Sequence, residues 1–195
     1  MKHPCFYLCL LMVACQPSFT LFAEEQTTVT NTILNVTDFS GLAIKKHFSD
    51  SWCYISNGNE IWAPSVAQVA RHANIEISLD YAELSSFEEA KKAVEYTINN
   101  AAAKLKKGIW KGATQQKMGD LSWYGDHTSR TSLFVVSQTT CFSVTCFGDE
   151  ENVAVHRTLC EQLALKIVEK IEQGGKVLMP DGTPPPQFVM DDLLD

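Results

Sequence analysis

The sequence lacks the short motifs that would assign it to a catalytic class at once. It contains no Gly-rich phosphate loop, no G-x-S-x-G, no H-E-x-x-H and no two cysteines separated by two residues. These spacings assemble the groups that a nucleotide site, a serine hydrolase, a zinc peptidase or a structural zinc site needs. We therefore expect neither a bound metal nor a cofactor.

Positive charge is also scarce. The 195 residues include 16 Lys and Arg against 23 Asp and Glu, which gives a net charge of −7. A nucleic-acid-binding face needs a surplus of basic side chains to neutralise phosphates, so we expect no nucleic-acid partner. The basic cluster that stands out is Lys106, Lys107 and Lys111 around Trp110. It is either a surface for an anionic partner or the solvated end of a helix.

Long hydrophobic runs are missing. A transmembrane helix needs about 20 apolar residues, whereas the run from Phe6 to Cys15 has ten. This run follows the basic residue Lys2, and Ala23 precedes two glutamates, a layout typical of a secretory signal peptide. We expect residues 1–23 to be removed and the chain to be exported to the periplasm or the extracellular space, with no transmembrane span.

A second interpretation of the N-terminus stays open. Residues 12–15, Met-Val-Ala-Cys, resemble a bacterial lipobox. In such a sequence the cysteine is lipidated and becomes the new N-terminus, so Cys15 would carry a lipid anchor. Both interpretations predict an exported protein.

Proline is absent between residues 65 and 179. Because proline interrupts helices and central strands, this stretch is the best candidate for an uninterrupted fold, and we expect a single domain at 39–173. Residues 24–38 are rich in Thr and Asn and are expected to form a linker or a loose strand. Residues 174–195 open with two glycines, contain three consecutive prolines and end in acidic residues, which predicts a flexible tail.

Two long segments have helical periodicity. Ser86 and Glu89 have the S-x-x-E spacing of a capping box, and apolar residues then follow at steps of three and four as far as Leu105. Residues 151–173 carry a second apolar stripe. Residues 65–72 are a weaker candidate for a short helix that follows a proline.

The remaining segments predict strands. Residues 75–81 alternate between apolar and polar side chains, which is typical of a half-buried strand. Asn57-Gly58 is a hairpin signal because both residues tolerate a positive φ. The other expected strands lie at 52–56, 60–62, 131–137 and 140–147. Their connections are too short for parallel crossovers, so we expect an α+β fold, with a mostly antiparallel sheet of about five to seven strands covered by two helices.

The order of these elements resembles that of the PsbP-like domains. Trp52 stands before the hairpin, and then come the strand NIEISLDY, the capped helix, a strand with Trp123 and Tyr124, and a last helix with LALKIVEKI. That family comprises α/β/α sandwiches of thylakoid-lumen photosystem subunits and bacterial envelope lipoproteins. The resemblance covers about residues 48–172. It implies a non-catalytic accessory or binding role and assigns a function to no single residue.

Four cysteines follow the expected cleavage site. Cys141 and Cys146 lie five residues apart on one expected strand, so their side chains point to opposite faces of the sheet. Cys146 shares its face with apolar neighbours, and Cys160 lies on the apolar stripe of the last helix. We therefore predict a Cys146–Cys160 disulfide, which leaves Cys53 with Cys141. The alternative is that all four are buried thiols.

Asp126 and His127 lie in the most polar segment of the strand region, residues 125–130. Beside a serine or a cysteine such a pair could act as acid and base, although stretches of this composition are also typical of turns. We therefore expect an exported, non-enzymatic binding or accessory protein whose partner is an unknown protein or envelope component. The alternative is a small secreted hydrolase that uses His127 and Asp126.

Overall fold

The computed structural model describes residues 30–187, apart from 106–109, 112–117, 128–129 and 149–152. Its elements are β1 Leu42–Ser56, β2 Asn59–His72, β3 Ile75–Glu83, α1 Phe87–Leu105, β4 Trp110–Lys111, β5 Leu121–His127, β6 Arg130–Ser137, β7 Thr140–Phe147 and α2 Val153–Glu172. The strands form one sheet in the order β1-β2-β3-β7-β6-β5-β4, and every neighbouring pair is antiparallel. The expected α+β fold with a mostly antiparallel sheet is confirmed.

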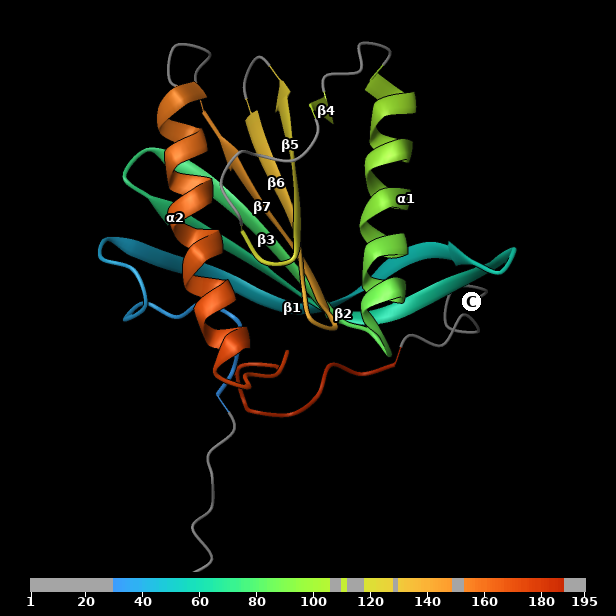
Figure 1. Cartoon of the computed structure of the whole chain (residues 1–195). Helices are drawn as coiled ribbons and strands as arrows, with labels where there is room; N and C mark the ends of the chain where they lie inside the picture. Colours follow the sequence, from blue (N-terminus) through green and yellow to red (C-terminus); the bar gives the residue numbers. More distant parts are fainter. Residues whose placement is uncertain (1–29, 106–109, 112–117, 128–129, 149–152, 188–195) are drawn as a thin grey trace, which may run out of the picture.

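The two helices lie on opposite faces of the sheet (Figure 1). Strand β6 shows why, because successive side chains of a strand point to opposite faces. Leu133 and Val135 pack with α2, whereas Phe134 and Val136 pack with α1. The sheet is therefore the middle layer, with a large apolar core on the α2 face and a smaller one on the α1 face.

The expected helices form where local signals placed them. The Ser86 hydroxyl accepts a hydrogen bond from the Glu89 amide at 3.2 Å, which caps the first turn of α1. The Glu89 carboxylate does not bond back to Ser86 in any contact that the structure gives. It accepts hydrogen bonds from Ser56 at 3.0 Å and from Lys92 at 2.7 Å, which ties the start of α1 to the end of β1.

The hairpin at Asn57-Gly58 forms as predicted, and both residues have positive φ values of 52° and 79°. Its two strands are much longer than the sequence indicated. Residues 65–72, which we considered as a short helix, belong to β2 and pair with both β1 and β3. Pairing on both sides satisfies the backbone of this segment, and it outweighs the helical preference of its Ala and Gln residues.

The packed fold also extends beyond the predicted boundaries of 39–173. Leu34 is fully buried, and its amide and carbonyl groups bond to the side chain of Gln68 at 3.1 and 2.8 Å. Thr32 donates its amide to the Lys176 carbonyl at 2.9 Å, and Val177 is only 3 % exposed. The described parts of the expected linker and tail therefore include core residues, because backbone pairing between distant segments covers their polar groups.

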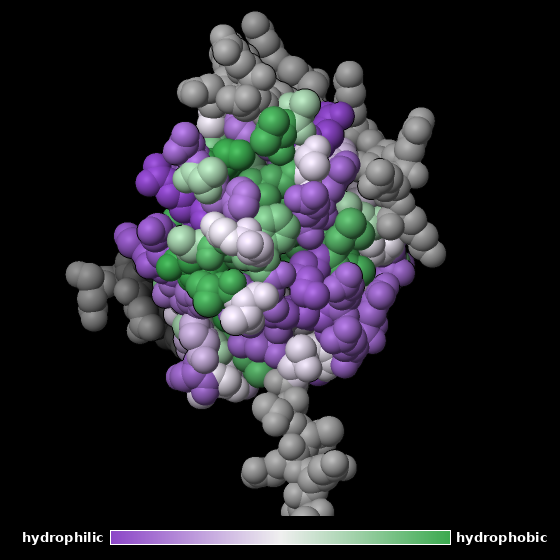
Figure 2. All heavy atoms as spheres, turned by 90° about the vertical axis from the view of Figure 1, so that its left-hand side faces the viewer, coloured by the Kyte–Doolittle hydropathy of each residue, from purple (hydrophilic) through white to green (hydrophobic). Residues whose placement is uncertain are grey.

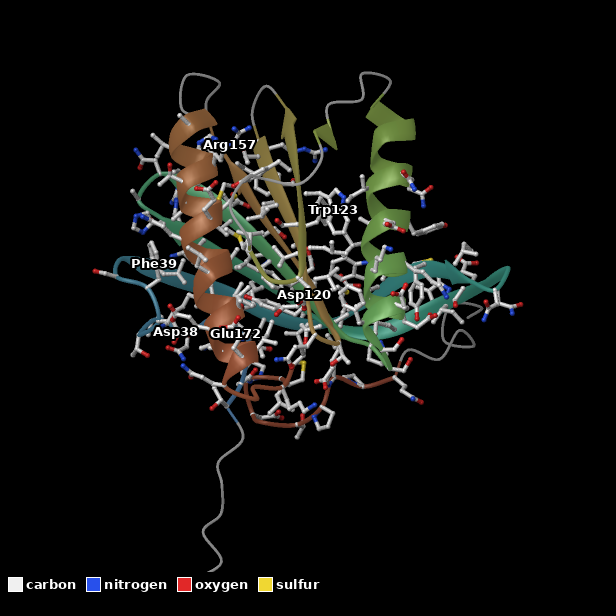
Figure 3. The ribbon with its side chains drawn as sticks, in the orientation of Figure 1. Asp38, Phe39, Asp120, Trp123, Arg157 and Glu172 are labelled. Carbon is white, nitrogen blue, oxygen red and sulfur yellow. The ribbon has the colours of Figure 1, made fainter. Side chains whose placement is uncertain are left out.

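The end of α2 holds residues 30–38, the N-terminal segment of the described chain, in place. Lys170 donates a hydrogen bond to the Ile33 carbonyl at 2.7 Å and forms an ion pair with Asp38 at 2.5 Å. Figure 3 shows Asp38 close to the last turns of this helix. Within the described residues, no helix combines the length and hydropathy that a bilayer span needs.

Candidate functional site

The α1 face of the sheet carries a polar area beside its apolar core. Asp80 of β3 pairs with Ser143 of β7, which pairs in turn with Phe134 of β6. In the next row, Thr145 of β7 pairs with Ser132 of β6. Paired residues on antiparallel strands share a face of the sheet, so all five side chains lie on the side that α1 covers.

A cavity of about 350 Å³ lies over this polar area. Its volume is in the range of small-molecule sites, about 300–1,000 Å³. The lining residues include the acidic Asp50 and Asp80, the basic Arg130, the aromatic Trp52 and Phe134, and six residues with hydroxyl side chains. Acceptors, donors, charges and apolar walls therefore meet in one hollow.

The wall between the cavity and α1 is fixed by hydrogen bonds. Trp52 of β1 is 7 % exposed, and its Nε1 donates to Thr97 Oγ1 of α1 at 2.9 Å. The Thr97 hydroxyl in turn donates a hydrogen bond to the Ala93 carbonyl at 2.9 Å. On the floor, the hydroxyl groups of Ser132 and Thr145 are 2.9 Å apart. These hydrogen bonds hold the lining side chains in one arrangement. A preorganised site loses less conformational entropy when a ligand binds, which favours binding.

Asp80 has the most unusual electrostatic environment of the lining. Its Oδ2 accepts a hydrogen bond from the Ser143 hydroxyl at 3.2 Å. Burial raises the pKa of Asp80 to about 6 and the nearby Asp50 carboxylate adds to the rise, while the Ser143 hydrogen bond opposes it. No basic side chain among the described residues pairs with Asp80. Asp80 is half-buried, and a carboxylate that loses part of its hydration without gaining a cation is destabilising; such groups are enriched at functional sites.

The structure does not test the predicted catalytic pair. Asp126 and His127 are the last two residues of β5, and their backbones pair with Thr131 and Arg130 of β6. Their side chains lie outside the described part of the chain. The hydrolase that would use them therefore stays a prediction.

The basic partner surface is described only in part. Trp110 and Lys111 form the short strand β4, which pairs with β5 at one end of the sheet order. Lys106 and Lys107 lie outside the described residues, as do the lipidation candidate Cys15 and the whole expected signal peptide.

The structure brings together one predicted cysteine pair. Cys146 of β7 and Cys160 of α2 are fully buried, and their Sγ atoms are 3.1 Å apart. The predicted opposite orientation of Cys141 and Cys146 is also confirmed, because Cys141 packs in the α1-face core and Cys146 in the α2-face core. The two buried sulfurs are neighbours, although 3.1 Å exceeds the length of a disulfide, about 2.05 Å.

The other proposed pairing, Cys53 with Cys141, is wrong. Cys53 lies on β1 and Cys141 on β7, and strands β2 and β3 separate them. Three strand spacings amount to roughly 14 Å, whereas bonded cysteines have Cα atoms within about 7 Å. Sequence order alone could not show that two whole strands lie between them.

Cys53 is also a poor nucleophile. Partial burial and a hydrogen bond to Glu60 at 3.2 Å raise the pKa of its thiol to about 11. A catalytic cysteine needs a lowered pKa and a basic neighbour. This environment weighs against a hydrolase that attacks through Cys53.

A second hollow lies between α2 and the ends of β2 and β3. It measures about 330 Å³, and its lining includes His72, Ile75, Val155 and Leu159. Among the described residues, the lining contains no lysine, arginine, aspartate or glutamate. Figure 2 shows hydrophobic residues exposed among polar ones on this side of the molecule. Val155, for example, is 54 % exposed. This hollow offers apolar contact without the charges that would select a ligand.

The sequence interpretation missed the polar cavity. Asp80 alternates with apolar residues on β3, a pattern that predicts only a half-buried strand, and nothing local shows that α1 covers the face that carries Asp80. A usable signal was present in the small polar residues at alternate positions of β7 and β6, namely Ser143, Thr145 and Ser132. Such a stripe differs from the long charged side chains that are common on a solvated sheet face.

No family model, curated protein or solved structure matches this chain. Among the described residues, no group of three or more His, Cys, Asp and Glu side chains is placed to hold a metal ion. The polar cavity between α1 and the sheet is therefore the candidate functional site.

Proposed function

We propose that this chain is an exported, non-catalytic binding protein and that its ligand site is the cavity between α1 and the sheet. The observation that carries the proposal is Asp80, a half-buried carboxylate that lines a polar cavity and has no basic partner among the described residues. A charge that lowers stability is expected where a ligand supplies the missing partner.

The composition of the lining supports binding rather than catalysis. The described lining contains no histidine that could serve as a base near neutral pH. Its one thiol, Cys53, has a raised pKa. What remains are hydrogen-bonding groups, two aromatic rings and fixed charges, which bind and orient a ligand.

Export and family relationship belong to the same proposal. The layout of residues 1–23 supports export by a signal peptide, or by a lipid anchor on Cys15. A PsbP-like fold is supported by the order of the elements and by the single helix on each face of an antiparallel sheet. An accessory role in the cell envelope is consistent with both.

A thermal-shift screen of small polar molecules tests the binding site. The wild-type chain is compared with Asp80→Asn and with the control Glu172→Gln, which removes an exposed carboxylate at the end of α2 (Figure 3). Each ligand-induced shift is measured against the ligand-free melting temperature of the same protein. A true ligand raises the melting temperature of the wild type and the control by several degrees and has little effect on Asp80→Asn.

Two results would reject the proposal. Either no compound stabilises the wild-type chain, or the stabilising compounds act equally on all three proteins. In the second case the ligands bind elsewhere on the molecule.

A further inference from the structure

We propose that the cavity binds a short zwitterionic peptide, with the peptide ammonium group at Asp80 and Asp50 and the peptide carboxylate at Arg130. This inference rests on the proposed function, because it names the ligand class of the same cavity.

At the acidic end of the cavity, no lysine or arginine of the described part of the chain forms an ion pair with Asp50 or Asp80. Asp50 and Asp80 both line the hollow, and Asp50 is close enough to act on the Asp80 carboxylate. The only hydrogen bond that the structure gives from the lining to Asp80 comes from Ser143 at 3.2 Å. A carboxylate has about four acceptor positions, so several stay open for the donors of an ammonium group.

The basic end lies across the sheet from the acidic end. Arg130 is four residues before Phe134 on β6, and Phe134 is aligned through Ser143 with Asp80, two strands away. Strand geometry then places the Cα atoms of Arg130 and Asp80 roughly 17 Å apart. Both residues line the same cavity, so one small molecule can contact both of them. Among the described residues, no carboxylate forms an ion pair with Arg130.

The middle of the cavity fits a peptide backbone. The Ser132 and Thr145 hydroxyls lie between the two ends and can donate to or accept from amide groups. Trp52 and Phe134 supply apolar walls for side chains. An extended chain covers about 3.3–3.6 Å per residue, so a tripeptide spans about 10 Å.

Other charge patterns fit this arrangement less well. A diamine would place a cation near Arg130, and a dicarboxylate would place an anion near Asp80, so each would be repelled at one end. A neutral saccharide would supply hydrogen bonds but no charge to either end, so it would lack the charge-assisted bonds that a zwitterion makes there. A small molecule with a positive group at one end and a negative group at the other complements both the acidic and the basic end of the cavity.

Calorimetric titration with tri-alanine and Ala-Phe-Ala tests the inference. Each peptide is used in free, N-acetylated and C-amidated form, against the wild-type chain, Asp80→Asn, Arg130→Gln and the control Arg71→Gln on the exposed part of β2. We expect each blocking group to weaken binding at least tenfold. Asp80→Asn should weaken the free peptide but not the acetylated one, and Arg130→Gln should weaken the free peptide but not the amidated one.

The outcomes separate this inference from the proposed function. If neither peptide binds, or if blocked and free forms bind equally, the zwitterionic peptide is wrong. If spermidine or maltotriose binds instead and Asp80→Asn abolishes that binding, the cavity remains the ligand site and only the ligand class is overturned. If none of these probes binds and the thermal-shift screen also finds no Asp80-dependent ligand, the proposed function fails as well.

Discussion

Asp80 faces a cavity in which its described neighbours are the Ser143 hydroxyl and a second carboxylate, Asp50. A carboxylate removed from water without a basic partner favours its protonated form, so it destabilises the folded chain at neutral pH. The pKa of about 6 makes this cost measurable.

Asp80→Asn should stabilise the chain in a pH-dependent way. The folded-state pKa is about 6, against 3.8 as the ordinary value. Folding therefore strengthens proton binding, and the resulting stability is present at low pH and lost as the pH rises through 6. The variant keeps an oxygen acceptor for Ser143. It should gain up to about 3 kcal/mol in the free energy of unfolding near pH 7.5 and nothing near pH 3.5.

Urea unfolding of both proteins at these two pH values measures the difference. A variant that is less stable than the wild type near pH 7.5 would mean that the Asp80 carboxylate has a stabilising cation in the folded chain.

Gln68 should be among the most costly side chains to replace. Its amide bonds to both backbone groups of Leu34 and accepts a hydrogen bond from the Tyr81 hydroxyl at 2.7 Å. Gln68→Met keeps the volume but leaves these buried groups without partners, which should cost about 3 kcal/mol or more. Chemical denaturation measures the loss, and Gln162→Met on the exposed side of α2 is the control. Equal stability of the two variants would contradict the role given to Gln68.

Residues of this kind could not be recognised from the sequence. Gln68 and Asp80 look like polar residues in mixed strands, and their importance depends on Leu34 and α1 being brought over them. The proximity of Cys146 and Cys160 could be predicted, because Cys146 lies on the apolar face of its strand, Cys160 lies on the apolar stripe of α2, and two such faces pack together. The Cys53–Cys141 pairing failed because elimination carries no information about the order of strands in a sheet.

At the scale of elements, local sequence signals were reliable where the backbone hydrogen bonds are made between residues that are close in sequence. The cap at Ser86 and the two-residue turn at Asn57-Gly58 act within a few residues, so α1 and the turn of the first hairpin were predicted correctly, but the length of its strands was not. Residues 65–72 and the segments beside 39–173 depend on distant partners, which no short window contains.

Ser86→Ala tests the cap of α1. Loss of the hydrogen bond to the Glu89 amide should lower the free energy of unfolding by about 1 kcal/mol. Ser85→Ala is a matched control, because Ser85 is exposed and precedes the cap by one residue. Thermal unfolding compares the three proteins, and an effect of the same size in the control would remove the cap from the explanation.

The contact between β7 and α2 predicts a redox-dependent link. Cys146 and Cys160 are 3.1 Å apart, so we expect them to form a disulfide after export into an oxidising compartment. The bond would close the loop that runs from Cys146 to Cys160, and a loop of this length should add about 3 kcal/mol to the free energy of unfolding. Alkylation of the unfolded chain without reductant should label Cys53 and Cys141 but not this pair. Labelling of all four cysteines in protein taken from the oxidising compartment would refute the link.

At the scale of the whole molecule, the sheet separates two different surfaces. The α2 face holds the larger apolar core and is closed at one end by the N-terminal segment and by residues 176–179. The α1 face holds the smaller core and the polar cavity. Stability and ligand binding are thus assigned to opposite faces, so a change in the cavity should leave the main core intact.

The most direct test of this account is native mass spectrometry of the chain purified from its own host, as wild type and as Asp80→Asn. We predict a wild-type chain that begins after Ala23 or at a lipidated Cys15 and carries a small non-covalent ligand that is lost in the variant. A chain that begins at Met1, with no bound small molecule in either form, would contradict an exported binding protein whose ligand site is the cavity at Asp80.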